Sequence, residues 1–240
     1  MLAVSPFAGS FVGTLIRRLP DGGPVVWDRS RCEQCGAKLG VRDLIPLASW
    51  AATRGRCRHC GAGLDWFYPA VEVAAVAVAV VSVVLDRGAM AWLDALLGWW
   101  LLALGWIDLR RWLLPDILTL PLIMAGLAEA AWFTPAELVD RGAAAVWSYL
   151  ALRLLAWLYR LARGFDGLGG GDAKLLSGTG AWVGTTGLAS VLLGAACGGL
   201  AVAGVLVLCG RKLSRNSALP FGPFLALATW LVWLFGPLSF

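Results

Sequence analysis

Long apolar runs that carry almost no charge constrain the fold of this chain more than any other feature. The longest covers residues 173–209 and contains one charged side chain, Lys174. About 20 apolar residues are enough to cross the hydrocarbon core of a bilayer as an α-helix, so this run is long enough for two crossings. Of the 240 residues, 59% are hydrophobic and 15% are charged, whereas a soluble domain carries about 25% charged residues. The sequence therefore predicts an all-α polytopic membrane protein.

Eight transmembrane helices with both chain ends outside account for the apolar runs. Nearly all Lys and Arg then lie on one side of the membrane, which the positive-inside rule assigns to the cytoplasm; Arg87 and Arg141 are the outer exceptions. The net charge of +5 therefore requires no nucleic-acid partner. We expect a first transmembrane helix at 1–19, a soluble insertion at 20–65, and a seven-helix membrane domain at 66–240. The expected helices of that domain lie near 66–85, 90–107, 117–133, 142–158 and 219–240, with two more within 173–209. We expect these last two to separate near 194–199.

The insertion at 20–65 holds two Cys-x-x-Cys pairs, Cys32 with Cys35 and Cys57 with Cys60. A two-residue gap lets both thiolates of a pair reach one metal ion, and two pairs complete a tetrahedral site. The spacing resembles that of a zinc ribbon. Four thiolates leave no open position, so we expect a structural zinc or another thiophilic metal. The density of Arg places the insertion in the cytoplasm, where thiols stay reduced, so a structural disulfide is the weaker alternative.

Two carboxylates follow apolar runs at the expected cytoplasmic face. Asp108 ends one run, and Asp172 follows Gly169, Gly170 and Gly171 just before the longest run. The simplest interpretation of Asp172 is a helix N-cap, whose side chain accepts the unpaired N–H groups of the first turn. Alternatively, the glycines let the backbone approach an extended substrate and bring Asp172 towards Asp108. Two adjacent carboxylates cannot both ionise cheaply, so one activates water while the other donates a proton. Amide hydrolysis of this kind needs no metal.

Three further charged residues lie near the same expected face. Glu72 lies so close to the hydrocarbon that it marks a functional site, unless it snorkels to the headgroups or pairs with an Arg of the insertion. Asp116 either caps the helix that follows it or competes with Asp108 for the catalytic role. Lys174 either positions the glycine loop or the substrate, or it snorkels to the interface.

Several unrelated motifs occur in one order along almost the whole chain, which makes them far more specific than a lone glycine motif. They are Gly9-Ser10-Phe11, Arg18-Leu19-Pro20, the two Cys pairs, Ile45-Pro46-Leu47-Ala48-Ser49-Trp50, Arg54-Gly55-Arg56-Cys57, Tyr68-Pro69-Ala70-Val71-Glu72, the segment from Asp108 to Asp116, Gly169-Gly170-Gly171-Asp172-Ala173-Lys174-Leu175, and Pro220-Phe221-Gly222-Pro223-Phe224. In these motifs the chain resembles the type IV prepilin peptidases, a bacterial family of aspartic peptidases with a Gly-x-Gly-Asp motif. Two positions depart from the family pattern: Glu33 replaces the usual Pro, and Gly13 replaces the usual Asn.

The resemblance implies a membrane aspartic endopeptidase of the bacterial inner membrane, with Asp108 and Asp172 as its catalytic pair. It implies cleavage of the leader peptide of prepilins and pseudopilins after a Gly, at the cytoplasmic face. It also implies N-methylation of the new N-terminal residue with S-adenosylmethionine as donor, although it assigns no residue of this chain to that donor. A prepilin has a short polar leader and an apolar helix, so its scissile bond lies at the inner interface, where the two acids are expected.

Two alternatives stay open. One is a related membrane peptidase of the same Gly-x-Gly-Asp class that does not methylate its product. The other is a non-enzymatic membrane scaffold or transporter with a metal ribbon, in which Asp108 and Asp172 are helix caps or ion ligands. This last alternative predicts that Asp→Asn at either position leaves prepilin cleavage intact.

Overall fold

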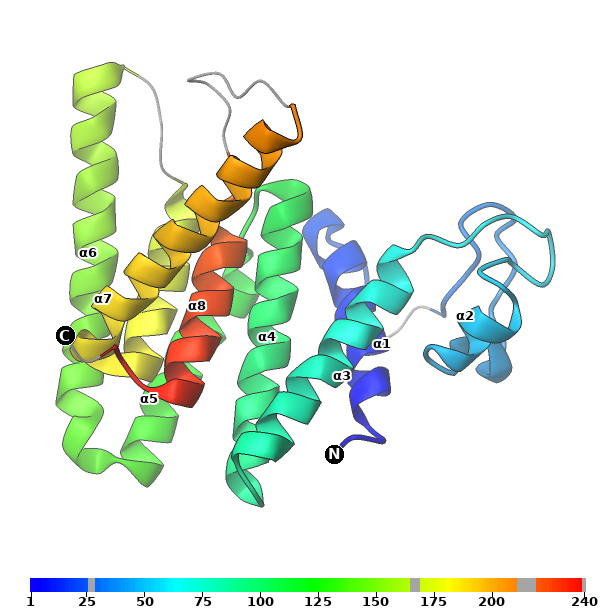
Figure 1. The fold of residues 1–240 in the computed structure, drawn as a ribbon, viewed down its shortest axis with the longest axis horizontal. Helices are drawn as coiled ribbons and strands as arrows, with labels where there is room; N and C mark the ends of the chain where they lie inside the picture. The colour runs from blue at the N-terminus through cyan, green and yellow to red at the C-terminus, as the bar shows by residue number, and fades with distance from the viewer. Residues whose placement is uncertain (26–28, 165–168, 211–218, 239–240) are drawn as a thin grey trace. The chain divides into compact units, whose positions relative to one another are not determined.

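The structure, a computed structural model, describes residues 1–25, 29–164, 169–210 and 219–238. Over these ranges the secondary structure is helical apart from two isolated β-bridges (Figure 1). The all-α fold that the apolar runs predict is thus confirmed. The elements are α1 (Ser5–Arg18), η1 (Leu19–Asp21), η2 (Val41–Leu44), α2 (Ala48–Ala52), α3 (Phe67–Leu85), α4 (Ala89–Arg111), α5 (Asp116–Phe133), η3 (Pro135–Glu137), α6 (Leu138–Arg163), α7 (Gly170–Leu208) and α8 (Gly222–Phe235).

The chain forms two compact units, Met1–Ala103 and Leu104–Phe240. The boundary between them falls inside α4. The predicted division into a first helix, an insertion and a seven-helix domain follows the expected topology in the membrane. The two units instead group the residues that pack together. That division therefore stays a prediction.

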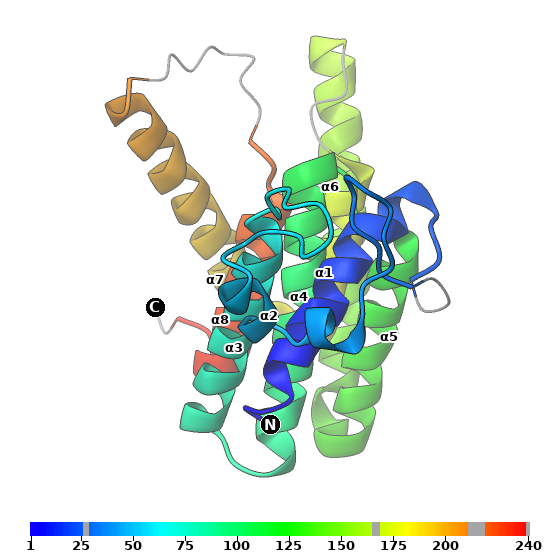
Figure 2. The ribbon, with the colours of Figure 1, turned by 90° about the vertical axis from the view of Figure 1, so that its right-hand side faces the viewer.

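In the first unit, α1 packs against α3. A Cβ atom on Gly9 would lie 2.7 Å from the Cα of Glu72, so the two helices approach this closely only because Gly9 has no side chain. The indole N–H of Trp99 donates a hydrogen bond to the carbonyl of Ala75 across 2.9 Å, which fastens the first part of α4 to α3. The loops between α1 and α3, which include α2, face the viewer in Figure 2.

In the second unit, α7 breaks at Gly184, whose φ of 67° and ψ of −174° lie outside the helical range. Before the break, the Thr179 hydroxyl lies 2.8 Å from that of Thr229 in α8. After the break, Cβ atoms on successive glycines would meet residues ever closer to the start of α8. Gly187 faces Val232, Gly194 faces Ala228, and Gly198 faces Phe224. The second part of α7 therefore returns along α8 (Figure 1).

This reversal agrees with the two crossings that residues 173–209 predict, but the predicted break near 194–199 is wrong. A sharp reversal needs a backbone conformation with positive φ, which glycine adopts without strain. Gly184 has that conformation. Gly194, Gly198 and Gly199 instead lie within the helix, where they allow the returning segment to pack against Ala228 and Phe224.

Five helices are long and apolar enough to cross a membrane: α3, α4, α5, α6 with η3, and α7. Helix α8 is apolar but shorter, and α1 has 14 residues. Large apolar side chains are exposed along these helices, among them Val84, Leu120, Met124, Leu155 and Leu200. Exposed side chains of this kind suit contact with lipid. A multi-pass membrane protein is therefore the architecture, whereas the number eight stays a prediction.

Arg141, one of the two predicted outer exceptions to the charge rule, has a structural role. Helix α6 begins at Leu138, so Arg141 lies in its first turn rather than in a loop, and its side chain is buried. Its guanidinium contacts the buried carboxylate of Glu129 and donates to Glu137 across 2.7 Å. Because these carboxylates neutralise the charge, Arg141 carries no information about membrane orientation.

Candidate active site and metal centre

Asp108 lies in the last turn of α4 and is buried. Its Oδ2 accepts a hydrogen bond of 3.0 Å from the backbone N–H of Gly222, the first residue of α8. A Cβ atom at Gly222 would lie 2.6 Å from that oxygen, so the contact requires glycine. The start of a helix also favours a negative charge, because its N–H groups are unpaired and its dipole is positive there.

Asp172 is the third residue of α7. Residue Gly169 is the N-cap, so the interpretation of Asp172 as the N-cap is wrong. The side chain nevertheless reaches back: a Cβ atom on Gly169 would lie 3.3 Å from Oδ2 of Asp172. Helix α7 begins at Gly170, earlier than expected, because the glycines at 170 and 171 adopt helical conformation rather than a turn. Gly167, two residues before Gly169, lies outside the described residues.

The fold brings Asp108 and Asp172 together, close enough to interact electrostatically. Gly171 makes this approach feasible. A Cβ atom there would lie 2.8 Å from the Cβ of Leu114, so a larger residue would push the start of α7 away from the segment that follows Asp108. Among the described acids predicted at this face, the electrostatic interaction joins these two, and their catalytic role stays a prediction.

Asp116 and Lys174 form an ion pair at the starts of α5 and α7, with 2.5 Å between Nζ and Oδ1. Asp116 is the first residue of α5 and Pro115 is its N-cap, so Asp116 lies within the first turn and does not cap the helix. Its side chain is exposed and already paired, whereas Asp108 is buried beside Asp172. The position of Asp116 therefore suits an ion pair that joins α5 to α7 better than a catalytic role. Lys174 is the other partner of this ion pair.

The four cysteines of the insertion form one cluster whose sulfur atoms lie within 4.8 Å of one another. Each pair has the same local fold. In the first, the N–H of Cys32 bonds to the carbonyl of Ala37 and the N–H of Gly36 bonds back to Cys32. In the second, Cys57 pairs in the same way with Ala62 and Gly61. This arrangement matches the tetrahedral thiolate set that zinc prefers.

The thiols of this cluster influence one another. Backbone hydrogen bonds at Cys35 and Gln34 lower the pKa of the Cys32 thiol to about 6. At Cys60 a backbone hydrogen bond from Ala62 acts in the same direction, but desolvation and the three other thiols outweigh it and raise its pKa to about 11. Thiols so close together cannot all ionise unaided, and a divalent cation removes that restriction. The residues present therefore fit a metal ion.

Glu72 lies in the first unit, and it is buried in the first turns of α3. Its Oε2 accepts a hydrogen bond of 2.8 Å from the backbone N–H of Leu47, in the insertion. A second hydrogen bond comes from Ser10 of α1. Among the described residues Glu72 forms no ion pair with an arginine, so the alternative of pairing with an Arg of the insertion is wrong.

Comparison with known proteins identifies the family. The N-terminal domain model of bacterial A24 peptidases matches residues 4–85, and the model of the type IV leader peptidase family matches residues 95–204. The chain is 39% identical to a prepilin leader peptidase/N-methyltransferase of Burkholderia pseudomallei (strain K96243), over 91% of this chain and 79% of that protein.

This chain belongs to the type IV leader peptidase family. It is also 40% identical to the Aeromonas salmonicida (strain A449) prepilin leader peptidase/N-methyltransferase, over 87% of this chain and 72% of the relative. With the Stutzerimonas stutzeri protein of the same name it shares 35% identity, over 98% and 89% of the two chains. No solved structure matches this member of the family.

Sequence reasoning missed two residues that touch the predicted site residues of this leader peptidase. Gly222 lies in a motif between Pro220 and Pro223, and its backbone N–H is the hydrogen-bond donor to Asp108. Leu47, the donor to Glu72, has a positive φ of 58°. Nothing in the local sequence indicates that contact, because it joins residues 25 positions apart.

Proposed function

We propose that this protein is a membrane aspartic endopeptidase that removes the leader peptide of type IV prepilins and pseudopilins and then N-methylates the new N-terminal residue. The observation that carries the proposal is the proximity of Asp108 and Asp172, which come from helices far apart in the chain. The names of the relatives, prepilin leader peptidase/N-methyltransferase, support both activities.

The acid pair would cleave the peptide bond by general acid–base catalysis. Two neighbouring carboxylates favour a state in which they hold one proton between them, because both cannot ionise cheaply. The ionised one takes a proton from water, the hydroxide attacks the scissile carbonyl, and the protonated one donates to the leaving amine. Titration belongs to the pair, so acid and base are not assigned to one residue each. The hydrogen bond from Gly222 would hold Asp108 in place throughout.

The remaining predicted site residues would support this pair. Gly169 and Gly171 leave room for the start of α7 beside Asp172 and Leu114. Asp116 and Lys174 would hold the starts of α5 and α7 together, which keeps the acid of α7 in register with that of α4. No metal takes part in this peptidase chemistry.

The substrate class follows from a membrane location. A prepilin presents its polar leader in the cytoplasm and its apolar helix in the bilayer, so we place the acid pair at the cytoplasmic face of the inner membrane. The arginines of the insertion and of the end of α4 support this orientation, since basic residues favour the cytoplasmic side.

Zinc and S-adenosylmethionine complete the proposal. Cys32, Cys35, Cys57 and Cys60 would hold one structural zinc ion, which would fold the insertion by joining its two halves. S-adenosylmethionine would supply the methyl group for the new N-terminus.

The test is a prepilin assay with the full chain in lipid nanodiscs and S-adenosylmethionine labelled in its methyl group. We expect Asp108→Asn and Asp172→Asn to lose about 10²–10⁴-fold in cleavage rate, the range for removal of an acid–base group. Both variants should still methylate a synthetic pilin N-terminus that is already free of its leader. Full cleavage by either variant, with insertion in the membrane confirmed, would exclude the acid pair and favour the scaffold alternative.

A further inference from the structure

The first unit contains a cavity of about 780 Å³ between α1, the insertion and the start of α3. This volume lies in the range of about 300–1,000 Å³ that is usual for small-molecule sites. Its lining includes Ser10, Arg17, Trp50, Trp66, Tyr68 and Glu72. The acid pair belongs to the other unit, so the cavity is a separate feature of the chain.

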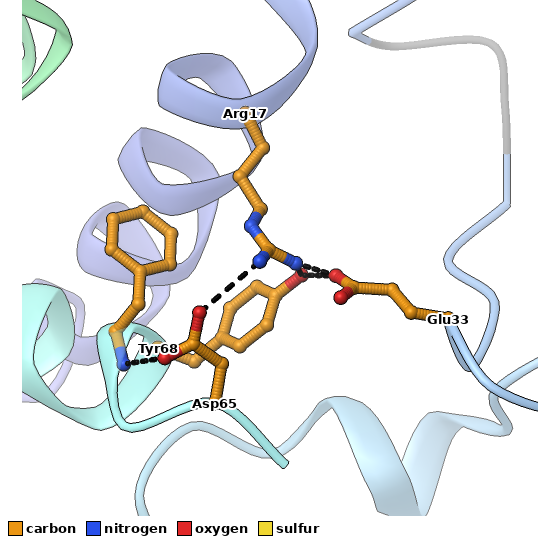
Figure 3. Close-up of polar contacts among 5 residues, drawn as sticks. Arg17, Glu33, Asp65 and Tyr68 are labelled. Atoms are coloured by element: carbon orange, nitrogen blue, oxygen red, sulfur yellow. Dashed lines mark hydrogen bonds and ion pairs between the residues drawn. The ribbon is translucent and has the colours of Figure 1, made fainter. Parts of the chain in front are cut away.

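The carboxylates of the cavity differ in how they are neutralised. Glu33 and Asp65 both contact the guanidinium of Arg17, which also bonds to the hydroxyl of Tyr68 (Figure 3). Glu72 is buried and is bonded only to neutral groups, the N–H of Leu47 and the side chain of Ser10, among the described residues. A buried carboxylate without a cationic partner is costly. A ligand with a positive charge would therefore bind beside Glu72 favourably.

Two tryptophan side chains, Trp50 and Trp66, line the same cavity. The rings of Trp50 and Trp66 lie with their centres 4.3 Å apart, and Trp66 is 71% exposed. The indole nitrogen Nε1 of Trp50 is buried and has no hydrogen-bond partner among the residues that the structure describes. This atom is enclosed, so what the two residues offer to a ligand in the cavity is the surface of their rings. Indole rings also stack well on planar aromatic bases.

We propose that this cavity is the binding site for S-adenosylmethionine, with Glu72 beside the cationic end of the donor and Trp50 and Trp66 against its adenine. The inference rests on the proposed methylation and assigns a place to its donor. The ligand carries a sulfonium and an ammonium, which suit Glu72, and a planar base, which suits the indole rings. Its carboxylate suits the basic rim, which includes Arg18, Arg29 and Arg31.

The transfer step balances within this arrangement. The lone pair of the pilin N-terminal amine attacks the methyl carbon of the sulfonium and forms a C–N bond. The C–S bond breaks and its electron pair stays on sulfur, which becomes the neutral thioether of S-adenosylhomocysteine. The amine releases one proton to water. Because the sulfonium loses its charge in this step, the product is held less tightly by Glu72 than the donor is.

The test measures binding rather than turnover, using the full chain in nanodiscs and S-adenosylmethionine without prepilin. We expect Glu72→Gln and Trp50→Phe each to weaken binding by about tenfold or more, as for loss of one partner of a buried contact. Asp86→Asn removes a carboxylate at the other end of α3, and Trp92→Phe removes an indole N–H in α4; both should bind as the unchanged chain does. Zinc content and the unfolding temperature check that each variant is folded.

A second measurement needs no variant. Ultraviolet cross-linking of labelled S-adenosylmethionine to the unchanged chain should label peptides within residues 46–72. Label confined to residues 104–240, or equal binding by folded Glu72→Gln and Trp50→Phe variants, overturns the assignment while the proposed methylation stands. A synthetic leader peptide could displace the donor from the chain without reducing methylation of a pre-cleaved pilin. That pair of results would assign the cavity to the leader instead. If the unchanged chain neither binds the donor nor methylates, the methylation half of the proposed function fails.

Discussion

The backbone N–H of Gly222 donates a hydrogen bond of 3.0 Å to Oδ2 of Asp108, although 114 positions separate the two residues. This contact fixes the acid at the end of α4 against the start of α8. The geometry leaves no room for a side chain at residue 222, and this restriction gives the first prediction.

Gly222→Ala should reduce prepilin cleavage strongly. The added Cβ would lie 2.6 Å from Oδ2 of Asp108, so the carboxylate must move, and a shift of about 1 Å at a catalytic group costs about 10²-fold in rate. Initial rates on a prepilin in nanodiscs measure this. Gly204→Ala is the matched control, because a Cβ there meets nothing within 4 Å. Equal rates for the two variants would mean that the position of Asp108 is not important for cleavage.

Asp116→Asn should reduce cleavage by less than about tenfold, because exposed ion pairs contribute about 1 kcal/mol or less. The side chain of Asp116 is 58% exposed and is bonded to Lys174. Asp108→Asn, assayed beside it, should lose far more. If Asp116→Asn is the more severe of the two, the catalytic pair is Asp116 with Asp172 and our assignment of Asp108 is wrong.

Metal analysis should find one zinc ion per chain. Cys57→Ser should lose that ion, because a tetrahedral thiolate site needs all four sulfur atoms for tight binding. Cys209→Ser, at the end of α7, should retain it. Elemental analysis of the purified chain, before and after a strong chelator, provides the measurement. A full complement of zinc in Cys57→Ser would place the metal elsewhere.

Arg141→Met should destabilise the second unit by about 3–5 kcal/mol, the usual cost of leaving a buried charge unpaired. The carboxylate of Glu129 would lose its buried partner, since both side chains are less than 10% exposed. Adding Glu129→Met to the same chain should recover most of that loss. Unfolding by denaturant in detergent measures the effect, with the exposed Arg87→Met as control. A loss equal to that of the control would show that the ion pair contributes little.

Composition and motif order were enough to predict the class of fold and the cysteine cluster, because both depend on local properties, whereas the catalytic role of the two acids stays a prediction. An apolar run must form a helix in hydrocarbon to satisfy its backbone, and a Cys-x-x-Cys pair can hold a metal wherever it occurs. The packing of the helices determined the contacts that the sequence did not predict. The ion pair of Arg141 with Glu129, the ion pair of Asp116 with Lys174, and the hydrogen bond from Gly222 to Asp108 join residues 12, 58 and 114 positions apart. The reversal at Gly184 places the second part of α7 against α8. Such contacts depend on how helices fit together, and local sequence does not encode which distant neighbour a side chain will meet.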